Sequence, residues 1–75
     1  MKNYKVGQTV TFSNGNKGEV ISIGTRGNGD IRPPYHKKGH PTIKGIDFVG
    51  YVSIIPNEWE KLYGDEVPEN ELQAN

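Results

Sequence analysis

The chain has 75 residues, of which 32% are apolar, with ten glycines, five prolines and no cysteine. A chain of this length is expected to form one domain, residues 1–75, whose core is too small to enclose a large substrate cavity. The lack of cysteine excludes disulfides and thiolate metal sites, and no apolar run approaches the roughly 18 residues that cross a bilayer. We therefore expect a cytoplasmic protein without a membrane partner, as a monomer or a weak homo-oligomer.

The net charge of zero is the sum of two unlike halves. Residues 1–45 carry eight Lys or Arg against two acidic residues, a net charge of +6. Residues 46–75 carry one lysine against seven acidic residues, a net charge of −6. This asymmetry points to a charged partner, unless the two halves neutralise each other in the folded molecule.

The first predicted elements are two strands joined by a hairpin. Residues 5–12 alternate, with Val6, Val10 and Phe12 on one side, which is the period-2 pattern of a half-buried strand. The loop "SNGNKG" that follows holds an Asn-Gly pair and a second glycine, which suit the positive φ of a hairpin turn. The β-branched run "EVISI" (residues 19–23) then predicts the second strand.

Residues 25–44 predict a long loop, because glycines and prolines interrupt both helix and strand periodicity there. Loops longer than about 12–15 residues are uncommon in compact domains and are usually functional or disordered. This loop is also the most basic part of the chain, so it is the first candidate for a binding element.

A third strand is predicted over residues 43–55, with apolar side chains on one face and a bend at Gly50. Residues 56–64 predict one short helix with Asn57 as its N-cap and Gly64 as its end. After the helix we expect a short edge strand at Val67, a turn that anchors Leu72, and a frayed tail at residues 73–75.

Together these elements predict a mainly β fold: a small, strongly curved antiparallel barrel with one short helix and a long basic loop. Its helix would cover an open end of the barrel with one apolar stripe. The expected core is Val10, Phe12, Val20, Ile23, Ile46, Phe48, Val52, Ile54, Trp59 and Leu62.

The segment "VGQTVTFSNGNKGEVISI" (residues 6–23) resembles the first hairpin of KOW-type and other SH3-like small barrels, in which a Gly-x-x-Val-x-Phe strand runs through a glycine loop into Gly-x-Val-x-x-Ile. The segment "VPENEL" (residues 67–72) is similar to the closing segment of many such barrels. The resemblance covers about a third of the chain and implies an SH3-like barrel fold. It also suggests the usual partners of KOW domains, RNA and the transcription or translation machinery, although the long loop and the predicted helix depart from the compact KOW pattern.

The basic loop supplies the candidate ligand-binding residues. Its cations, an aromatic side chain for stacking and glycines that let the backbone approach phosphates are the combination that an RNA or single-stranded DNA binder needs. A surface loop must also be polar to stay soluble, so a merely solvated connection is the competing interpretation. The candidate residues are Arg26, Arg32, Tyr35, His36, Lys37, Lys38 and Lys44.

Catalysis and metal binding are not expected. His36 and His40 are four residues apart, but Gly39 and the neighbouring prolines disfavour the helix that would align them, and zinc needs three or four protein ligands. No serine stands beside a histidine or in an elbow motif, and the Gly-x-x-Gly tetrads flank a strand rather than join two helices. We expect a non-enzymatic protein without cofactor or metal.

Two binding roles remain. We favour nucleic-acid binding through the loop, because five cations and an aromatic side chain fit a phosphate backbone simply. The alternative is a protein–protein interaction or inhibitor module of bacterial or phage type. In that case Tyr35, held by two prolines, would anchor a partner protein, and the acidic C-terminal half would form a second surface.

Overall fold

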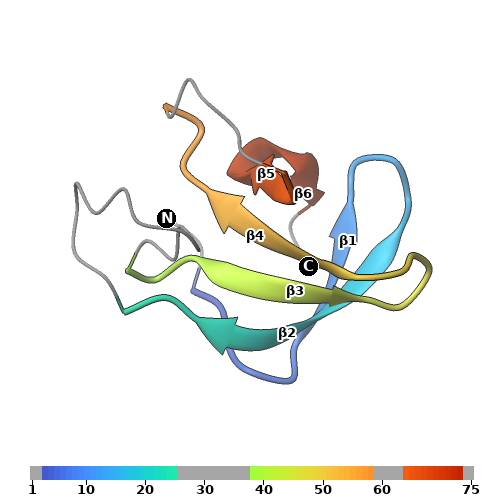
Figure 1. Cartoon of the computed structure of the whole chain (residues 1–75), viewed down its shortest axis with the longest axis horizontal. Coiled ribbons are helices and arrows are strands. Elements are labelled where there is room, and N and C mark those ends of the chain that lie inside the picture. Colours follow the sequence, from blue (N-terminus) through green and yellow to red (C-terminus); the bar gives the residue numbers. More distant parts are fainter. Residues whose placement is uncertain (1–2, 26–37, 59–63, 74–75) are drawn as a thin grey trace.

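The computed structural model describes residues 3–25, 38–58 and 64–73, and in this part of the chain six strands form one sheet (Figure 1). The spatial order of the strands is β5-β4-β3-β2-β1-β6. In chain order the elements are β1 (Thr9–Phe12), β2 (Lys17–Ile23), β3 (Pro41–Gly45), β4 (Tyr51–Ile55), β5 (Glu66–Pro68), the 3-10 helix η1 (Glu69–Glu71) and β6 (Leu72–Gln73). The prediction of a mainly β fold is confirmed. Within the described ranges, no helix has the length and apolar character needed to cross a bilayer.

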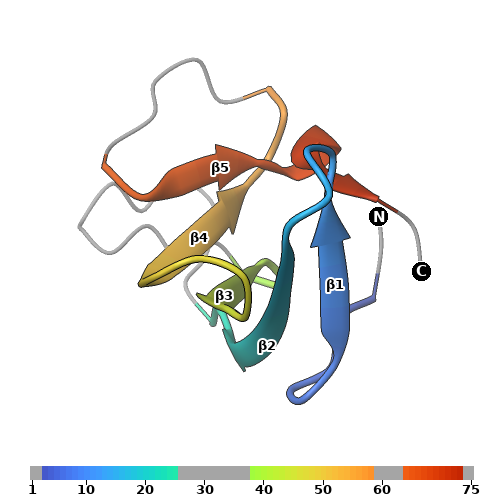
Figure 2. The same cartoon turned by 90° about the vertical axis from the view of Figure 1, so that its right-hand side faces the viewer.

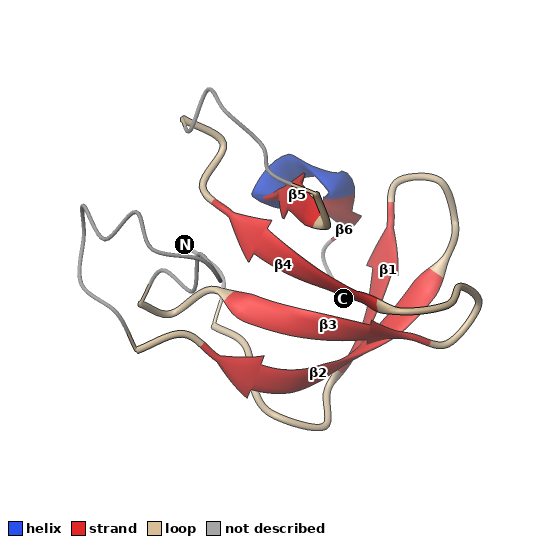
Figure 3. Cartoon of the chain, viewed as in Figure 1, coloured by secondary structure: helices blue, strands red, loops and turns tan. Residues whose placement is uncertain are grey.

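The sheet is curled so strongly that one short segment joins its two edges (Figures 2 and 3). β5 pairs with β4 at one edge and β6 pairs with β1 at the other, yet only η1 separates them in the chain. We call residues 66–73 the closing segment. The other four strand pairings are antiparallel, but the pairing of β4 with β5 is parallel, so the predicted antiparallel arrangement is confirmed except at this edge, where it is wrong. β5 begins with Glu66 beside Ser53 and runs in the same direction as β4 to Pro68 beside Ile55.

The core lies on the concave face of the sheet and is almost entirely aliphatic. Four predicted core residues are buried, and three more are half-buried and pack against them. The buried ones are Val10, Phe12, Val20 and Ile54, and the half-buried ones are Ile23, Phe48 and Val52. Ile43, Ile55 and Leu72 belong to the buried set as well, and full burial of one such side chain stabilises the fold by about 1.5–3 kcal/mol. Ile46 is 56% exposed, so its prediction as a core residue is wrong, and Trp59 and Leu62 lie outside the described residues.

The predicted third strand is in fact two strands, β3 and β4, which are joined by a turn at residues 46–50. The Gly45 amide donates to the Gly50 carbonyl at 3.0 Å, and Gly50 has a φ of 104°, which lets the chain reverse there instead of bending. Lys44 consequently pairs with Tyr51 across the hairpin. The apolar alternation continued through the turn in sequence, which is why it indicated a single strand.

The predicted loop at residues 25–44 ends earlier than expected, because β3 begins at Pro41 and pairs with β2. Hydrogen bonds between Gly24 and the Gly39–His40 segment extend this pairing: the Gly24 amide donates to the His40 carbonyl at 2.8 Å, and the Gly39 amide to the Gly24 carbonyl at 3.0 Å. Of the predicted helix, Asn57 and Glu58 lie in a turn, while residues 59–63 fall outside the described part.

Candidate functional site

The turn between β3 and β4, which we call the 46–50 turn, is held in place by hydrogen bonds to β2. Its backbone is fixed to Lys17 of β2: the Ile46 amide donates to the Lys17 carbonyl at 2.9 Å, and the Lys17 amide donates to Asp47 Oδ2 at 3.0 Å. Phe48 then folds back over Gly45 so closely that a Cβ at position 45 would lie 2.6 and 2.8 Å from two ring carbons. The turn is therefore held from both sides.

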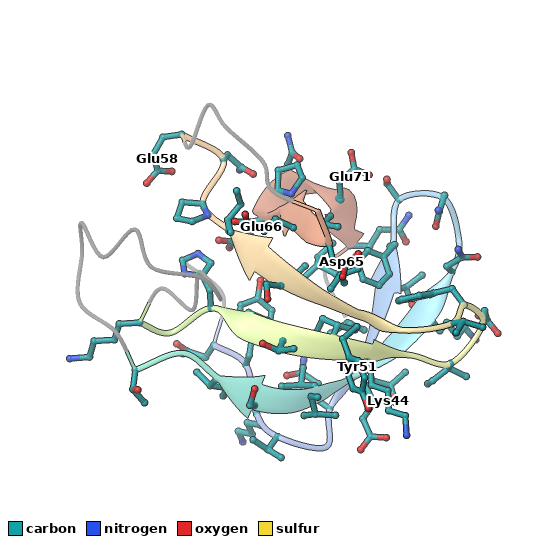
Figure 4. All side chains as sticks on the ribbon, viewed as in Figure 1. Lys44, Tyr51, Glu58, Asp65, Glu66 and Glu71 are labelled. Carbon is teal, nitrogen blue, oxygen red and sulfur yellow. The ribbon has the colours of Figure 1, made fainter. Side chains whose placement is uncertain are left out.

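This anchored turn divides its apolar side chains between the core and the solvent. Phe48 points inward and meets Phe12 edge to face, with ring centroids 5.6 Å apart and an interplanar angle of 80°. Ile46 is 56% exposed, and Val49 is exposed as fully as in an extended chain, at 103%. Tyr51, the first residue of β4, is 53% exposed and lies beside Lys44 (Figure 4). A rigid turn thus presents apolar groups that the fold does not cover.

An open apolar pocket of about 160 Å³ adjoins the turn. Phe12, Phe48, Val52 and Val67 supply its apolar lining, and Asn14 and Asn16 of the β1–β2 hairpin supply its polar groups. None of the described residues that line it is charged. The volume exceeds a cavity of about 150 Å³ that holds a benzene molecule and falls short of the roughly 300 Å³ of ordinary small-molecule sites. The pocket therefore fits one side chain better than a nucleotide or a substrate.

The two asparagines are positioned by the hairpin loop itself. The Asn16 amide donates to Asn14 Oδ1 at 2.9 Å, while the Asn16 carbonyl accepts from the Phe12 amide at 2.8 Å. Gly15 between them has a φ of 91°, which the predicted Asn-Gly turn requires. The loop is tied to the closing segment through Ser13, whose amide and hydroxyl both donate to Glu71.

The charged residues that are close in sequence to the pocket residues are mostly negative. Asp65, Glu66, Glu69 and Glu71 lie in residues 64–73, which contain no Lys or Arg, and Val67 of the pocket sits among them. Figure 4 shows Asp65, Glu66 and Glu71 on and beside the closing segment. Asp47 adds an exposed carboxylate in the 46–50 turn, and Lys17 is the one cation within two residues of a pocket residue.

A second polar cluster, His40 with Glu69 and Tyr4, ties the closing segment to the start of β3. His40 is only 4% exposed, and its Nε2 lies 2.8 Å from Glu69 Oε2. Burial first, and then the charge of Glu69, raise the pKa of Tyr4 to about 12. The Tyr4 hydroxyl and His40 Nδ1 are both buried and have no hydrogen-bond partner among the described residues. Glu69 therefore affects the pKa of Tyr4 mainly through its charge. His40 is thus a structural residue, which its place in a basic stretch did not indicate.

The structure does not bring the predicted ligand-binding residues together where it describes them. Lys38 and Lys44 are both exposed, but Lys38 precedes β3 and Lys44 lies near its far end. The pocket adjoins the turn that follows β3, so Lys38 is at the opposite end of that strand from it. The other predicted residues lie outside the described part of the chain: Arg26, Arg32, Tyr35, His36 and Lys37. Over the described ranges, no three His, Cys, Asp or Glu side chains are grouped so that they could hold a metal ion.

Comparison with known proteins gives no assignment: no family model, no curated protein and no solved structure matches this chain. The resemblance of residues 6–23 to KOW-type barrels therefore stays a prediction. The sequence did single out Phe12, Phe48 and Val52, but as parts of a filled core. Whether these residues border an open pocket depends on how strands distant in the sequence come together at the edge of the curled sheet. Local sequence patterns do not predict this.

Proposed function

We propose that this chain is a non-enzymatic module that binds a partner protein through the 46–50 turn and the pocket beside it. The observation that carries the proposal is the full exposure of Val49 on a turn whose backbone is fixed by hydrogen bonds. Scattered apolar residues on a surface are ordinary, but Val49 and Ile46 lie in the same turn as Phe48, which lines an open apolar pocket. Exposed apolar side chains gathered in one element are typical of protein interaction sites.

The rigidity of the turn supports the same proposal. A partner that meets an ordered turn orders few further side chains, so less of the interaction energy is lost to conformational entropy. Phe48 contributes to this order from below, since its ring is wedged between Gly45 and Phe12.

The finer fold assignment also belongs to this proposal. A 3-10 helix precedes the last strand, and that strand pairs with the first at Phe12 and Leu72. This arrangement supports the expectation of an SH3-like barrel, for which the sequence resemblance of residues 6–23 was the first indication. Fold alone does not assign a partner, so the function is argued from the surface.

The test compares Val49→Asp with Ile21→Asp, a matched change at an exposed apolar residue in the bulge of β2. A photo-crosslinking residue at position 49 identifies the bound protein in cells, and titration calorimetry with the purified partner then measures affinity. We expect Val49→Asp to weaken binding at least about tenfold and Ile21→Asp to change it less than about threefold. Equal effects, or no cross-linked partner, would refute the proposal. A cross-link only to a second copy, with self-association in sedimentation, would replace the partner by this chain itself.

Binding to nucleic acid remains a prediction. It rests on a set of residues of which the described part contains only Lys38 and Lys44, on separate ends of β3.

A further inference from the structure

We infer that the pocket receives one phenylalanine-sized, uncharged side chain from a partner segment whose flanking residues are basic. This inference rests on the proposed function, because it names the segment that a protein-binding module would select. The pocket carries it through three properties: its size, its lining and the charges around it.

Size and lining define the anchor side chain. A volume of about 160 Å³ accommodates one phenyl ring with little room left. The rings of Phe12 and Phe48 already meet edge to face, and a third ring beside them would gain the same kind of contact in addition to burial. The lining residues in the described part of the chain carry no charge, so an ionised anchor would lose its hydration without gaining an ion pair with them.

The rim favours a peptide around that anchor. Asn14 and Asn16 line the pocket, and the amide groups of an asparagine both donate and accept hydrogen bonds. The backbone on either side of an anchor residue offers the complementary carbonyl and N–H groups.

The charges define the flanks. Exposed Asp47 and Asp65 lie within two residues of pocket residues, and half-exposed Glu71 accepts a hydrogen bond from Ser13, the neighbour of Phe12 and Asn14. Among the described residues, Lys17 is the one cation within two residues of a residue that lines the pocket. An excess of carboxylates attracts Lys or Arg beside the anchor and repels phosphate groups. The same charges therefore weigh against a nucleic-acid strand at this pocket.

The experiment titrates isotope-labelled protein at low salt with acetyl-Lys-Lys-Phe-Lys-Lys-amide and follows the backbone amides of Phe48, Val52 and Val67 by NMR. Replacing the peptide's phenylalanine with alanine should weaken binding at least about tenfold. Replacing its lysines with glutamate should weaken binding several-fold. Equal binding of the lysine and glutamate peptides would refute the inferred flanks, and equal binding of the phenylalanine and alanine peptides would refute the anchor.

Two protein variants locate the binding. Val67→Phe fills the pocket and should abolish the shifts, with a thermal melt to confirm that the variant folds. Asp65→Asn removes the charge but keeps the backbone carbonyl that accepts from the Ser53 amide, so it should reduce the preference for lysine flanks several-fold. The control is Glu19→Gln on the outer face of β2, which should leave that preference unchanged. Unaltered peptide binding by Val67→Phe would overturn the pocket assignment.

Other occupants have their own signatures. If an RNA oligomer shifts the pocket amides at lower concentration than the peptide, the occupant is a nucleic acid and the inference fails. If protein concentration alone shifts them, the occupant is a second copy and the inference fails as well. Failure here is separable from failure of the proposed function: a partner that loses affinity on Val49→Asp but not on Val67→Phe would uphold the turn and exclude the pocket.

Discussion

Replacing Gly45 with alanine should be the most informative single change in this fold. An added Cβ would lie 2.6 and 2.8 Å from two ring carbons of Phe48 and closer still to the Phe48 carbonyl oxygen. Real Cβ atoms do not approach other atoms so closely, and a backbone oxygen cannot rotate away as a flexible side chain can. Crowding of this kind typically costs about 1–3 kcal/mol, and the backbone contact places Gly45→Ala near the upper end. In a domain of this size, about 3 kcal/mol corresponds to a fall in melting temperature of about 12–24 °C.

The matched control is Gly50→Ala at the other end of the same turn. Gly50 has a φ of 104° and open space around its missing Cβ, so alanine there incurs backbone strain of about 1–2 kcal/mol without any clash. Chemical denaturation followed by circular dichroism measures both variants, alone and combined with Phe48→Ala. Because Phe48→Ala removes two of the three clashes, its cost should be non-additive with Gly45→Ala by about 1 kcal/mol and additive with Gly50→Ala. A smaller cost for Gly45→Ala than for Gly50→Ala, or additivity in both pairs, would refute the packing described for the turn.

Three further predictions test other parts of the molecule. Because the pKa of Tyr4 is raised to about 12 from its ordinary 10, the folded state holds the hydroxyl proton more tightly than the unfolded state. The stability it contributes should therefore be complete below about pH 10 and be lost as pH rises through 12, and Tyr4→Phe should remove this part of the alkaline decline in urea unfolding. Asn57→Ala should destabilise the fold by about 0.5–1.5 kcal/mol and shift the Asn70 amide resonance, since Asn57 Oδ1 accepts from that amide at 2.7 Å; Asn57→Asp, which keeps an acceptor, should do neither. If the basic loop binds single-stranded RNA, log affinity should fall with log salt at about −0.7 per phosphate contact, and Lys37→Ala with Lys38→Ala should make the slope shallower; no salt-sensitive binding in the wild type would end that hypothesis.

The sequence predicted those elements whose causes are local. The alternation around Val10 and Phe12 and the Asn14-Gly15 pair specify the first hairpin within fifteen residues, and the structure has it, with Gly15 at positive φ. The same kind of evidence misled at residues 46–50. The apolar alternation runs on through the turn, where Gly50 at positive φ lets the chain reverse and hydrogen bonds fix the turn to Lys17, about 30 positions earlier.

The site was predicted in part for the same reason. The sequence predicted that Phe12, Phe48 and Val52 are apolar and face inward, which is correct. A residue that borders a core and one that borders a pocket share this pattern, so the pocket itself was not predicted. The partnership of His40 with Glu69 spans 29 positions and has no motif. Contacts between residues so far apart in sequence form only when the sheet curls, so sequence periodicity and motif spacing cannot predict them.

The closing segment makes this curled sheet sensitive to aggregation in a particular way. Within residues 66–73, β5 pairs with β4 and β6 pairs with β1. If this segment detached by local unfolding, β4 and β1 would both become edge strands at once. Most sheets that lose a terminal strand expose one new row of unpaired backbone groups, whereas this one would expose two, one on β4 and one on β1. A molecule with two open edges can add a neighbour on each side and so propagate a chain. Mutations that loosen the hold of Ser13 on Glu71, or of His40 on Glu69, should therefore affect solubility more than their effect on stability would suggest.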